Sequence, residues 1–357
     1  MNIRCIPAEQ LTPEHLAVWA SIQRADAALD SPYFRPEFTR AVAAVRGDVE
    51  VGILEEGGEP VGFFPFQRGP RNVARPVGGK MSDFQGVVAR REAVWDPRRL
   101  LHGCRLSAWH FDHLVASQQP FQPYHWSVAP SPYLDLSRGW EGYESEQLAI
   151  HRESFKRTMR KLRHTVREAG PLRVQIHSSS PTVLQTLIKW KSEQYHRTRV
   201  VNVFAFDWTA ALLQRVLAAQ GEGFSGVMSA LYIGDVMAAI LLSMRSYDVL
   251  HAWFSAYRPE YAQFSPGLIS WLELVKAYSA IGIRRVDLGK GPEEYKTHVM
   301  SGTVDVAEGS VDFRPVTRLL RRHWQRAYEW ARRSRLRRPL LIPGRVLRSM
   351  VESRNFR

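Results

Sequence analysis

The stretch between Gly226 and Met300 constrains the fold most, because apolar runs of strand length alternate there with turn residues. A turn signal, Gly234-Asp235, separates the first two runs. Ser265-Pro266-Gly267 predicts the start of a helix, since serine suits the N-cap and proline the first helical position. Gly282 is expected to end that helix. The expected strands are residues 228–233, 236–244, 249–257 and 285–288.

This order of elements predicts a site for an acyl donor. An antiparallel sheet leads into a helix N-terminus, and the chain then returns as a strand. The first turn of a helix offers unpaired N–H groups and the positive end of the helix dipole, which together attract an anion such as a phosphate.

Four motifs support this interpretation: Ala256-Tyr257-Arg258-Pro259-Glu260-Tyr261, Ser265-Pro266-Gly267-Leu268, Asp287-Leu288-Gly289 and Tyr295-Lys296. In this order they resemble the CelD/BcsL-type acetyltransferases of the GNAT superfamily, which occur in bacterial polysaccharide-biosynthesis loci, including those for cellulose. The resemblance begins at about Arg152 and covers roughly half of the chain. The layout also resembles that of the FemABX peptidoglycan aminoacyltransferases, which carry two GNAT-like domains.

The N-terminal part contains a second hairpin pattern. Residues 51–68 align without a gap on residues 228–245, so that Leu54 falls on Leu231, Gly57 on Gly234 and Arg68 on Arg245. Any two hairpins can align in this way, but a duplicated half would explain both the match and the length. We therefore expect an α/β (or α+β) fold with tandem GNAT-like domains, in which helices flank mixed, mostly antiparallel sheets. The expected boundaries are residues 1–148, 149–313 and a basic helical tail at 314–357.

The net charge of +14 lies mostly in this tail, where fourteen Arg and two Glu give +12. An apolar stripe that includes Trp324 predicts a basic amphipathic helix suited to an anionic membrane surface; RNA binding and docking on the body are alternatives. No apolar run is long enough to span a membrane and no signal peptide is evident, so a cytoplasmic protein, or one peripheral on the inner face of the cytoplasmic membrane, is expected. No specific nucleic acid partner is expected.

Two helices are expected next to the catalytic sheet. Residues 151–168 form a basic amphipathic pattern, either a solvated helix that bridges two domains or a wall for an anionic substrate. The helix over residues 181–197 carries Trp190 and Tyr195, and Arg199 follows it. In the resembled family such residues line the acceptor side, although Trp190 also suits a core position. Asp83 and Gln85 are further candidates for binding the acceptor; the alternative is that their loop is only a solvated turn.

For the donor, the resemblance implies Ser265 and Gly267 at the helix start, with Gln263 and Arg258 before them. The usual GNAT pyrophosphate loop, Arg/Gln-x-x-Gly-x-Gly/Ala, is absent. Gly267 alone stands in the right region, which leaves the identity of the donor open.

For catalysis, Lys296 is the main candidate for stabilising charge, beside Tyr295, and Asp287 is the candidate base. His251 is an alternative base or a core histidine, Glu294 is another carboxylate, and solvent could also take the proton.

Other enzyme classes are disfavoured, because the motifs of dinucleotide-binding proteins, P-loop enzymes, serine hydrolases and zinc sites are missing. The expected function is N- or O-acyl transfer from acetyl-CoA, without a metal, to a sugar, polysaccharide or cell-envelope precursor. The alternatives are an aminoacyl-tRNA-dependent transferase and a non-catalytic, membrane-associated component of a polysaccharide-synthesis machine.

Overall fold

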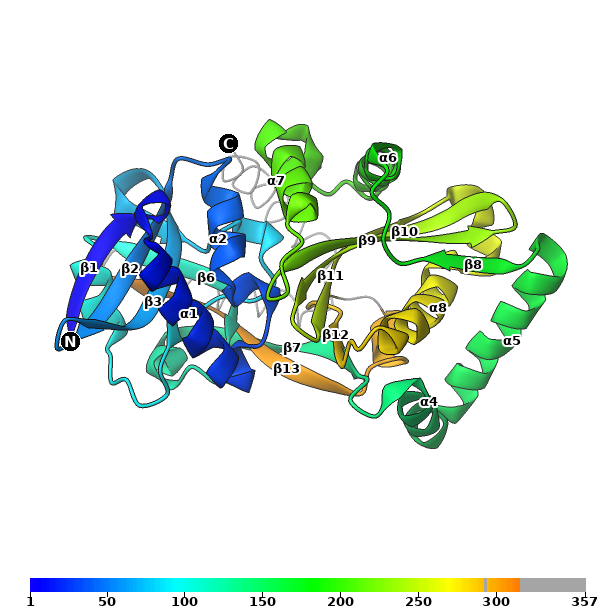
Figure 1. The fold of residues 1–357 in the computed structure, drawn as a ribbon, viewed down its shortest axis with the longest axis horizontal. Helices are drawn as coiled ribbons and strands as arrows, with labels where there is room; N and C mark the ends of the chain where they lie inside the picture. Colours follow the sequence, from blue (N-terminus) through cyan, green and yellow to red (C-terminus); the bar gives the residue numbers. More distant parts are fainter. Residues whose placement is uncertain (292–293, 315–357) are drawn as a thin grey trace, which may run out of the picture.

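The computed structural model describes residues 1–291 and 294–314, and it shows two halves joined along one sheet (Figure 1). We call residues 2–115 the first repeat and residues 172–287 the second repeat. The first repeat consists of β1 (Asn2–Pro7), α1 (Pro13–Ala25), α2 (Pro36–Ala43), β2 (Val49–Glu56), β3 (Glu59–Arg68), β4 (Val73–Arg75), β5 (Val88–Ala89), α3 (Pro97–Gly103) and β6 (Ala108–Val115).

The second repeat has the same order of elements, apart from β5. It consists of β8 (Leu172–Gln175), α6 (Pro181–Thr198), α7 (Asp207–Ala218), β9 (Ser225–Ile233), β10 (Val236–Ser246), β11 (Val249–Tyr257), α8 (Pro266–Ala280) and β12 (Arg285–Asp287). Between the repeats lie β7 (His125–Asp135), α4 (Gly139–Ile150) and α5 (Arg152–Ala169), and after them come α9 (Glu294–Thr297) and β13 (Gly302–Asp312). Short 3-10 helices cover Ala8–Gln10, Ala27–Leu29, Pro32–Phe34, Pro70–Asn72, Gly79–Met81, Gln119–Tyr124, Val203–Ala205 and Pro259–Phe264.

The described strands form one 13-stranded sheet in the order β1-β2-β3-β4-β6-β13-β7-β12-β11-β10-β9-β8, with β5 beside β3. At its centre the repeats exchange strands: β7 follows the first repeat but pairs with β12, and β13 follows the second repeat but pairs with β6. The two exchanged strands also pair with each other, in the middle of Figure 1. The expected boundary at residues 148/149 stays a prediction, because this sheet runs through both halves.

The hairpins of the two repeats share an irregularity as well as a shape. In β2–β3, Leu54 pairs with Gly62 and Glu55 with Pro60, which skips Val61. In β9–β10, Leu231 pairs with Ala239 and Tyr232 with Met237, which skips Ala238. All five positions correspond at the offset of 177 residues that separates Val51 from Met228. A β-bulge at the same position is a specific feature that two unrelated hairpins would rarely share, so it supports an internal repeat.

Helices cover both faces of the sheet. Side chains of α1 and α2, such as Trp19 and Phe38, share one core with side chains of α6 and α7, such as Leu187 and Leu212. A second core lies under α3, and a third packs α8 and α4 against the second repeat. The prediction of a mixed α/β fold with helices flanking the sheet is confirmed. The predicted tail, except Arg314, lies outside the described residues.

Tyr143 of α4 is buried and donates a hydrogen bond to the carbonyl of Val299. One expectation about local structure is wrong. Ser265 precedes α8 as expected, but its side chain does not cap the helix. Its φ of 53° is left-handed, whereas a capping serine uses an extended backbone.

The helix α5 lies along the outer edge of the second half in Figure 1, so it does not bridge the two halves. No helix in the described part of the chain is long and apolar enough to cross a membrane.

Candidate active site

The candidate site lies where two parallel strands of the second repeat separate. Among the described residues, β11 and β12 pair over only three positions, and the last pair is His251 with Asp287. Beyond it, the N–H of Leu288 donates to the carbonyl of Pro132 in β7, while β11 continues to Tyr257. We call this opening the fork.

A β-bulge in β11 lies directly beyond the fork. Leu242 of β10 pairs with Phe254 and Ser243 with Ala252, so Trp253 is the extra residue. A bulge leaves backbone groups without a ladder partner and re-aims neighbouring side chains. Two positions further on, the carbonyl of Ser255 accepts a hydrogen bond from Lys191 Nζ of α6. The bulge therefore leaves Trp253 without a paired residue in β10, and the carbonyl of Ser255 accepts from a side chain of α6.

The N-terminus of α8 faces the end of the same strand. A Cβ placed on Gly267 would lie 3.8 Å from the ring of Tyr257, and it would meet no other described atom within 4 Å outside its own stretch of helix. Lys161 Nζ of α5 donates to Ser265 Oγ at 3.0 Å. Since the serine does not cap the helix and a lysine lies beside it, this helix end is suited to a phosphate.

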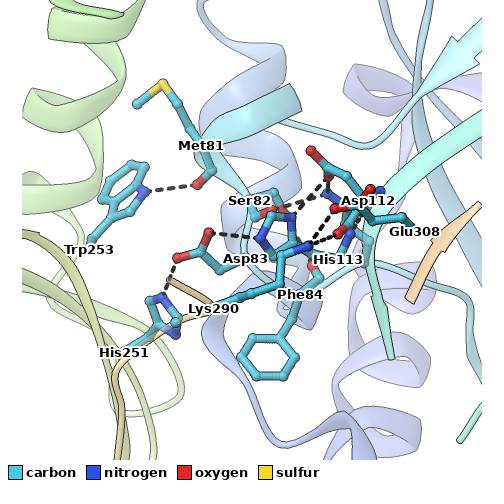
Figure 2. A network of polar contacts seen from close by, with 12 residues as sticks. Met81, Ser82, Asp83, Phe84, Asp112, His113, His251, Trp253, Lys290 and Glu308 are labelled. Carbon is cyan, nitrogen blue, oxygen red and sulfur yellow. Dashed lines mark hydrogen bonds and ion pairs between the residues drawn. The ribbon is translucent and has the colours of Figure 1, made fainter. Parts of the chain in front are cut away.

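A loop of the first repeat covers the fork from one side, as Figure 2 shows. Asp83 Oδ2 lies 2.9 Å from His251 Nε2, and the indole N–H of Trp253 donates to the carbonyl of Met81 at 2.8 Å. These residues come from the two repeats, separated by about half of the chain. The loop is therefore fixed to β11 at two places: at His251, just before the bulge, and at Trp253, the bulged residue.

Gly289 makes the close approach of this loop possible. It follows β12 with a φ of 71°, and a Cβ there would lie 2.8 Å from Asp83 Oδ2. Lys296 Nζ donates to the carbonyl of Gly289 at 3.1 Å and is only 7% exposed. The candidate lysine is thus buried beside the fork instead of lying on the surface.

Electrostatic contacts keep the carboxylates of Asp83, in this loop, and Asp112, in β6, ionised. Burial raises the pKa of Asp83, but the hydrogen bond with His251 and the charges of His251, His113 and Lys296 outweigh it, so the net pKa lies below its ordinary value. Burial also raises the pKa of Asp112, but the hydrogen bond and the charge of His113 outweigh it, so that the net pKa of Asp112 is about 2.

Gln85 has a supporting role in the structure. Its amide donates to Asp112 and to the carbonyl of Ser82, and its oxygen accepts the N–H groups of Asp112 and His113. All of this amide's contacts are within the protein, so the geometry does not show it facing a substrate.

The candidate residues Asp287 and Tyr295 lie in different elements, Asp287 at the end of β12 and Tyr295 in α9. Asp287 is buried, and its Oδ1 lies 2.7 Å from a guanidinium nitrogen of Arg285. Its Oδ2 has no partner among the described residues. Tyr295 lies in α9 next to Lys296.

The helix α6 borders the fork on the acceptor side. The guanidinium of Arg258 lies 5.9 Å from the ring centre of Trp190. Burial and the charge of Asp83 raise the pKa of Tyr195 to about 12. Gln263 and Arg199 are exposed, Gln263 in the 3-10 helix before α8 and Arg199 at the end of α6. The structure therefore brings Asp83, Tyr195, Asp287 and Lys296 to the fork, and Ser265 and Gly267 to the start of α8.

The sequence offers His251 only as an alternative base, and it does not identify Asp83 as the partner of His251. The signal in the sequence is a histidine near the start of the expected strand 249–257, two residues before Trp253. No group of three potential metal-ligating side chains is found in the described part of the chain.

Comparison with known proteins agrees with this geometry. Residues 152–297 match the family model of the acetyltransferase (GNAT) domain. No curated protein matches the chain.

Solved structures share the fold over almost the whole chain. A structure described as FemX has a TM-score of 0.56 at 11% identity and covers 90% of this chain and 100% of its own. The C-terminal domain of a putative lysylphosphatidylglycerol synthetase from Agrobacterium fabrum has a TM-score of 0.54 at 13% identity, with 86% and 94% covered.

A tandem GNAT protein from the clavulanic acid biosynthesis pathway has a TM-score of 0.50 at 10% identity, with 88% and 99% covered. The predictions of tandem GNAT-like architecture and of an acyltransferase are confirmed, the second by the match of residues 152–297 to the GNAT acetyltransferase domain.

Proposed function

We propose that the chain transfers an acyl group from acetyl-CoA to an amine or hydroxyl of a sugar, polysaccharide or cell-envelope precursor. The observation that carries the donor assignment is the fork between β11 and β12, which opens toward an uncapped helix N-terminus beside Lys161. The acceptor class rests on the resemblance to the CelD/BcsL-type enzymes.

The donor fits this place chemically. The diphosphate of coenzyme A is an anion that the start of α8 and Lys161 would attract. Its pantetheine arm contains amide groups, and an open strand edge can pair with an extended chain of that kind. The thioester would then lie at the bulge, where unpaired backbone N–H groups can stabilise the oxyanion of the tetrahedral intermediate.

The acceptor would approach from α6 and the Asp83 loop. Trp190, Tyr195 and Arg258 offer an aromatic surface with polar groups at its edge. Such a surface suits a sugar, whose ring carries both C–H and hydroxyl groups.

One observation favours a second donor, an aminoacyl-tRNA. The Lys and Arg residues of α5 are all exposed, and five of them have no ion pair among the described residues: Arg152, Lys156, Arg157, Arg160 and Arg163. This surface continues from the start of α8, and the solved structures with the same fold include FemX. Lys161 would bind phosphate in either case.

Calorimetry with acetyl-CoA separates the two donors. Saturable binding that added RNA does not reduce supports acetyl-CoA; no binding, together with tight salt-dependent binding of RNA, supports the alternative. Gly267→Val is the test of the donor position, because its side chain would extend into the open space at the helix start. The variant should stay folded and lose acetyl-CoA binding, and unchanged affinity would contradict the assignment.

We further propose that residues 314–357 bind an anionic membrane surface, since the Arg-rich pattern favours it at roughly 1 kcal/mol per basic side chain near the lipid. Truncation after Phe313 should abolish sedimentation with anionic liposomes at low salt. Equal sedimentation of the truncated protein would contradict this proposal.

A further inference from the structure

One acid–base group at the fork, Asp83, comes from the first repeat, outside the residues that match the GNAT domain. Asp83 and His251 form a hydrogen-bonded pair that neighbouring aromatic rings hold in place. The ring of Tyr33 lies 4.9 Å from that of His251, and the ring of Phe84 lies 5.9 Å from it, both edge-on. Two residues of the first repeat thus fix the imidazole in addition to its hydrogen bond with Asp83.

The side chains of Asp83 and His251 differ in their exposure to solvent. The side chain of His251 is 0% exposed, whereas that of Asp83 is 25% exposed. Asp83 Oδ2 is engaged by His251, but Oδ1 lies 3.9 Å from the nearest imidazole nitrogen of His113, which is beyond hydrogen-bond distance. One carboxylate oxygen is therefore held at the fork with the capacity to accept a hydrogen bond.

The rival carboxylate is less suitable. Asp287 is 1% exposed and is ion-paired with Arg285. An acceptor would have to displace buried side chains to reach it. Asp83 also lies on the side where Tyr195 borders the fork, which is the acceptor side of the proposed function.

We propose that Asp83 is the base that takes the proton of the acceptor, and that His251 is the positioning residue that holds it. This proposal rests on the proposed function and adds that the first repeat completes the active site of the second.

In the reaction, the acceptor N–H or O–H donates to Asp83 Oδ1 while its lone pair attacks the thioester carbon. The new C–N or C–O bond forms, the C–S bond breaks, and the proton moves to Asp83. The sulfur leaves as the thiolate of coenzyme A and takes a proton from water. Lys296 and the hydrogen bond from His251 keep Asp83 ionised before the reaction.

The test uses the full chain with acetyl-CoA as donor and either water or millimolar glucosamine as the acceptor probe, and it measures thiol release. Asp83→Asn and Asp83→Gly should each slow release about a hundredfold. Their affinity for acetyl-CoA and their unfolding temperature should stay near those of the wild type. Asp48→Asn is the matched control, because Asp48 is also a hydrogen-bonded carboxylate of the first repeat but lies between Arg46 and Gln67.

Chemical rescue separates a base from a structural carboxylate. Added formate should partly restore Asp83→Gly, where the side chain leaves space, and should not restore Asp83→Asn, where the amide fills it. Release at the wild-type rate by Asp83→Asn, absence of rescue, or a wild-type chain that binds acetyl-CoA without releasing thiol would each overturn the proposal. A wild-type chain that does not bind acetyl-CoA would instead overturn the proposed function, and this proposal with it.

Discussion

The helices α3 and α8 occupy equivalent places in the two repeats but begin in opposite ways. The carboxylate of Asp96 caps α3 and accepts the N–H groups of Arg98 and Arg99. The start of α8 has no side-chain cap, and Lys161 lies beside it. A negative charge thus occupies the place in the first repeat where a phosphate would bind in the second.

The strand edges beside these two helices also differ between the repeats. In the first repeat, β4 and β6 pair over only two positions. Beyond them, the segment around Gln85 occupies the edge of β6. The N–H of Gln85 donates to the carbonyl of His113, and the N–H of Val115 donates to the carbonyl of Gln85. In the second repeat the corresponding strands are β11 and β12, and within the described ranges no segment pairs with β11 on this side beyond His251. Under the proposed function, one architecture thus has two roles: the second repeat binds the donor, while the first fills its own strand edge and presents Asp83 to its neighbour.

The largest effect is expected at Lys296, which belongs to the second repeat's site. Lys296→Met keeps most of the side-chain stem and removes the charge. Loss of one charge-assisted contact near the fork should slow turnover about a hundredfold, while the lost hydrogen bond to Gly289 should cost about 1 kcal/mol of unfolding free energy. Steady-state rates and thermal unfolding measure the two effects; wild-type turnover would reduce Lys296 to a structural role.

Exchange of the helix caps tests the comparison directly. Ser265→Asp gives α8 the carboxylate that α3 has, and repulsion of the donor phosphates should weaken acetyl-CoA binding about tenfold. Asp96→Ser, the control in the first repeat, should leave binding unchanged. Equal affinities of Ser265→Asp and the wild type would mean that the phosphates bind elsewhere.

The contact between the repeats should show in the pH dependence of stability. Burial, together with the charges of Asp248 and Asp287, raises the pKa of Asp30 to about 6, although Arg285 and Arg24 act against it. The folded state then binds more protons than the unfolded state between about pH 4 and pH 6, so stability falls as pH rises through this range.

Asp30→Asn removes the titration and should stabilise the protein at pH 7 by about 1–3 kcal/mol. Denaturant unfolding of both proteins at pH 4.5 and pH 7 checks this. An equal difference at the two pH values would contradict the assignment.

The smallest effect should be the same in both repeats. Gly57 and Gly234 take corresponding places in the two hairpin turns, with φ of 60° and 57°. Replacement of either by alanine should cost about 1 kcal/mol, because a Cβ is strained in this region. Unequal costs would show that the turns are not equivalent.

The sequence predicted local features well and contacts between the repeats poorly. The hairpin alignment holds in the structure, because strand patterns and turn glycines are local signals; the shared bulge at Val61 and Ala238, which the sequence did not predict, falls on aligned positions. The exchange of β7 and β13 and the pairing of Asp83 with His251 join residues far apart in the chain, which no local pattern specifies. The capping of Ser265 was wrong because the left-handed backbone there depends on the preceding 3-10 helix.

The number of acetyl-CoA molecules bound per chain tests the central claim most directly. Titration calorimetry on the wild-type chain should give one site, which Ser265→Asp weakens and Asp96→Ser leaves intact. Two sites, or one site that responds to Asp96→Ser instead, would contradict the assignment of the donor to the second repeat.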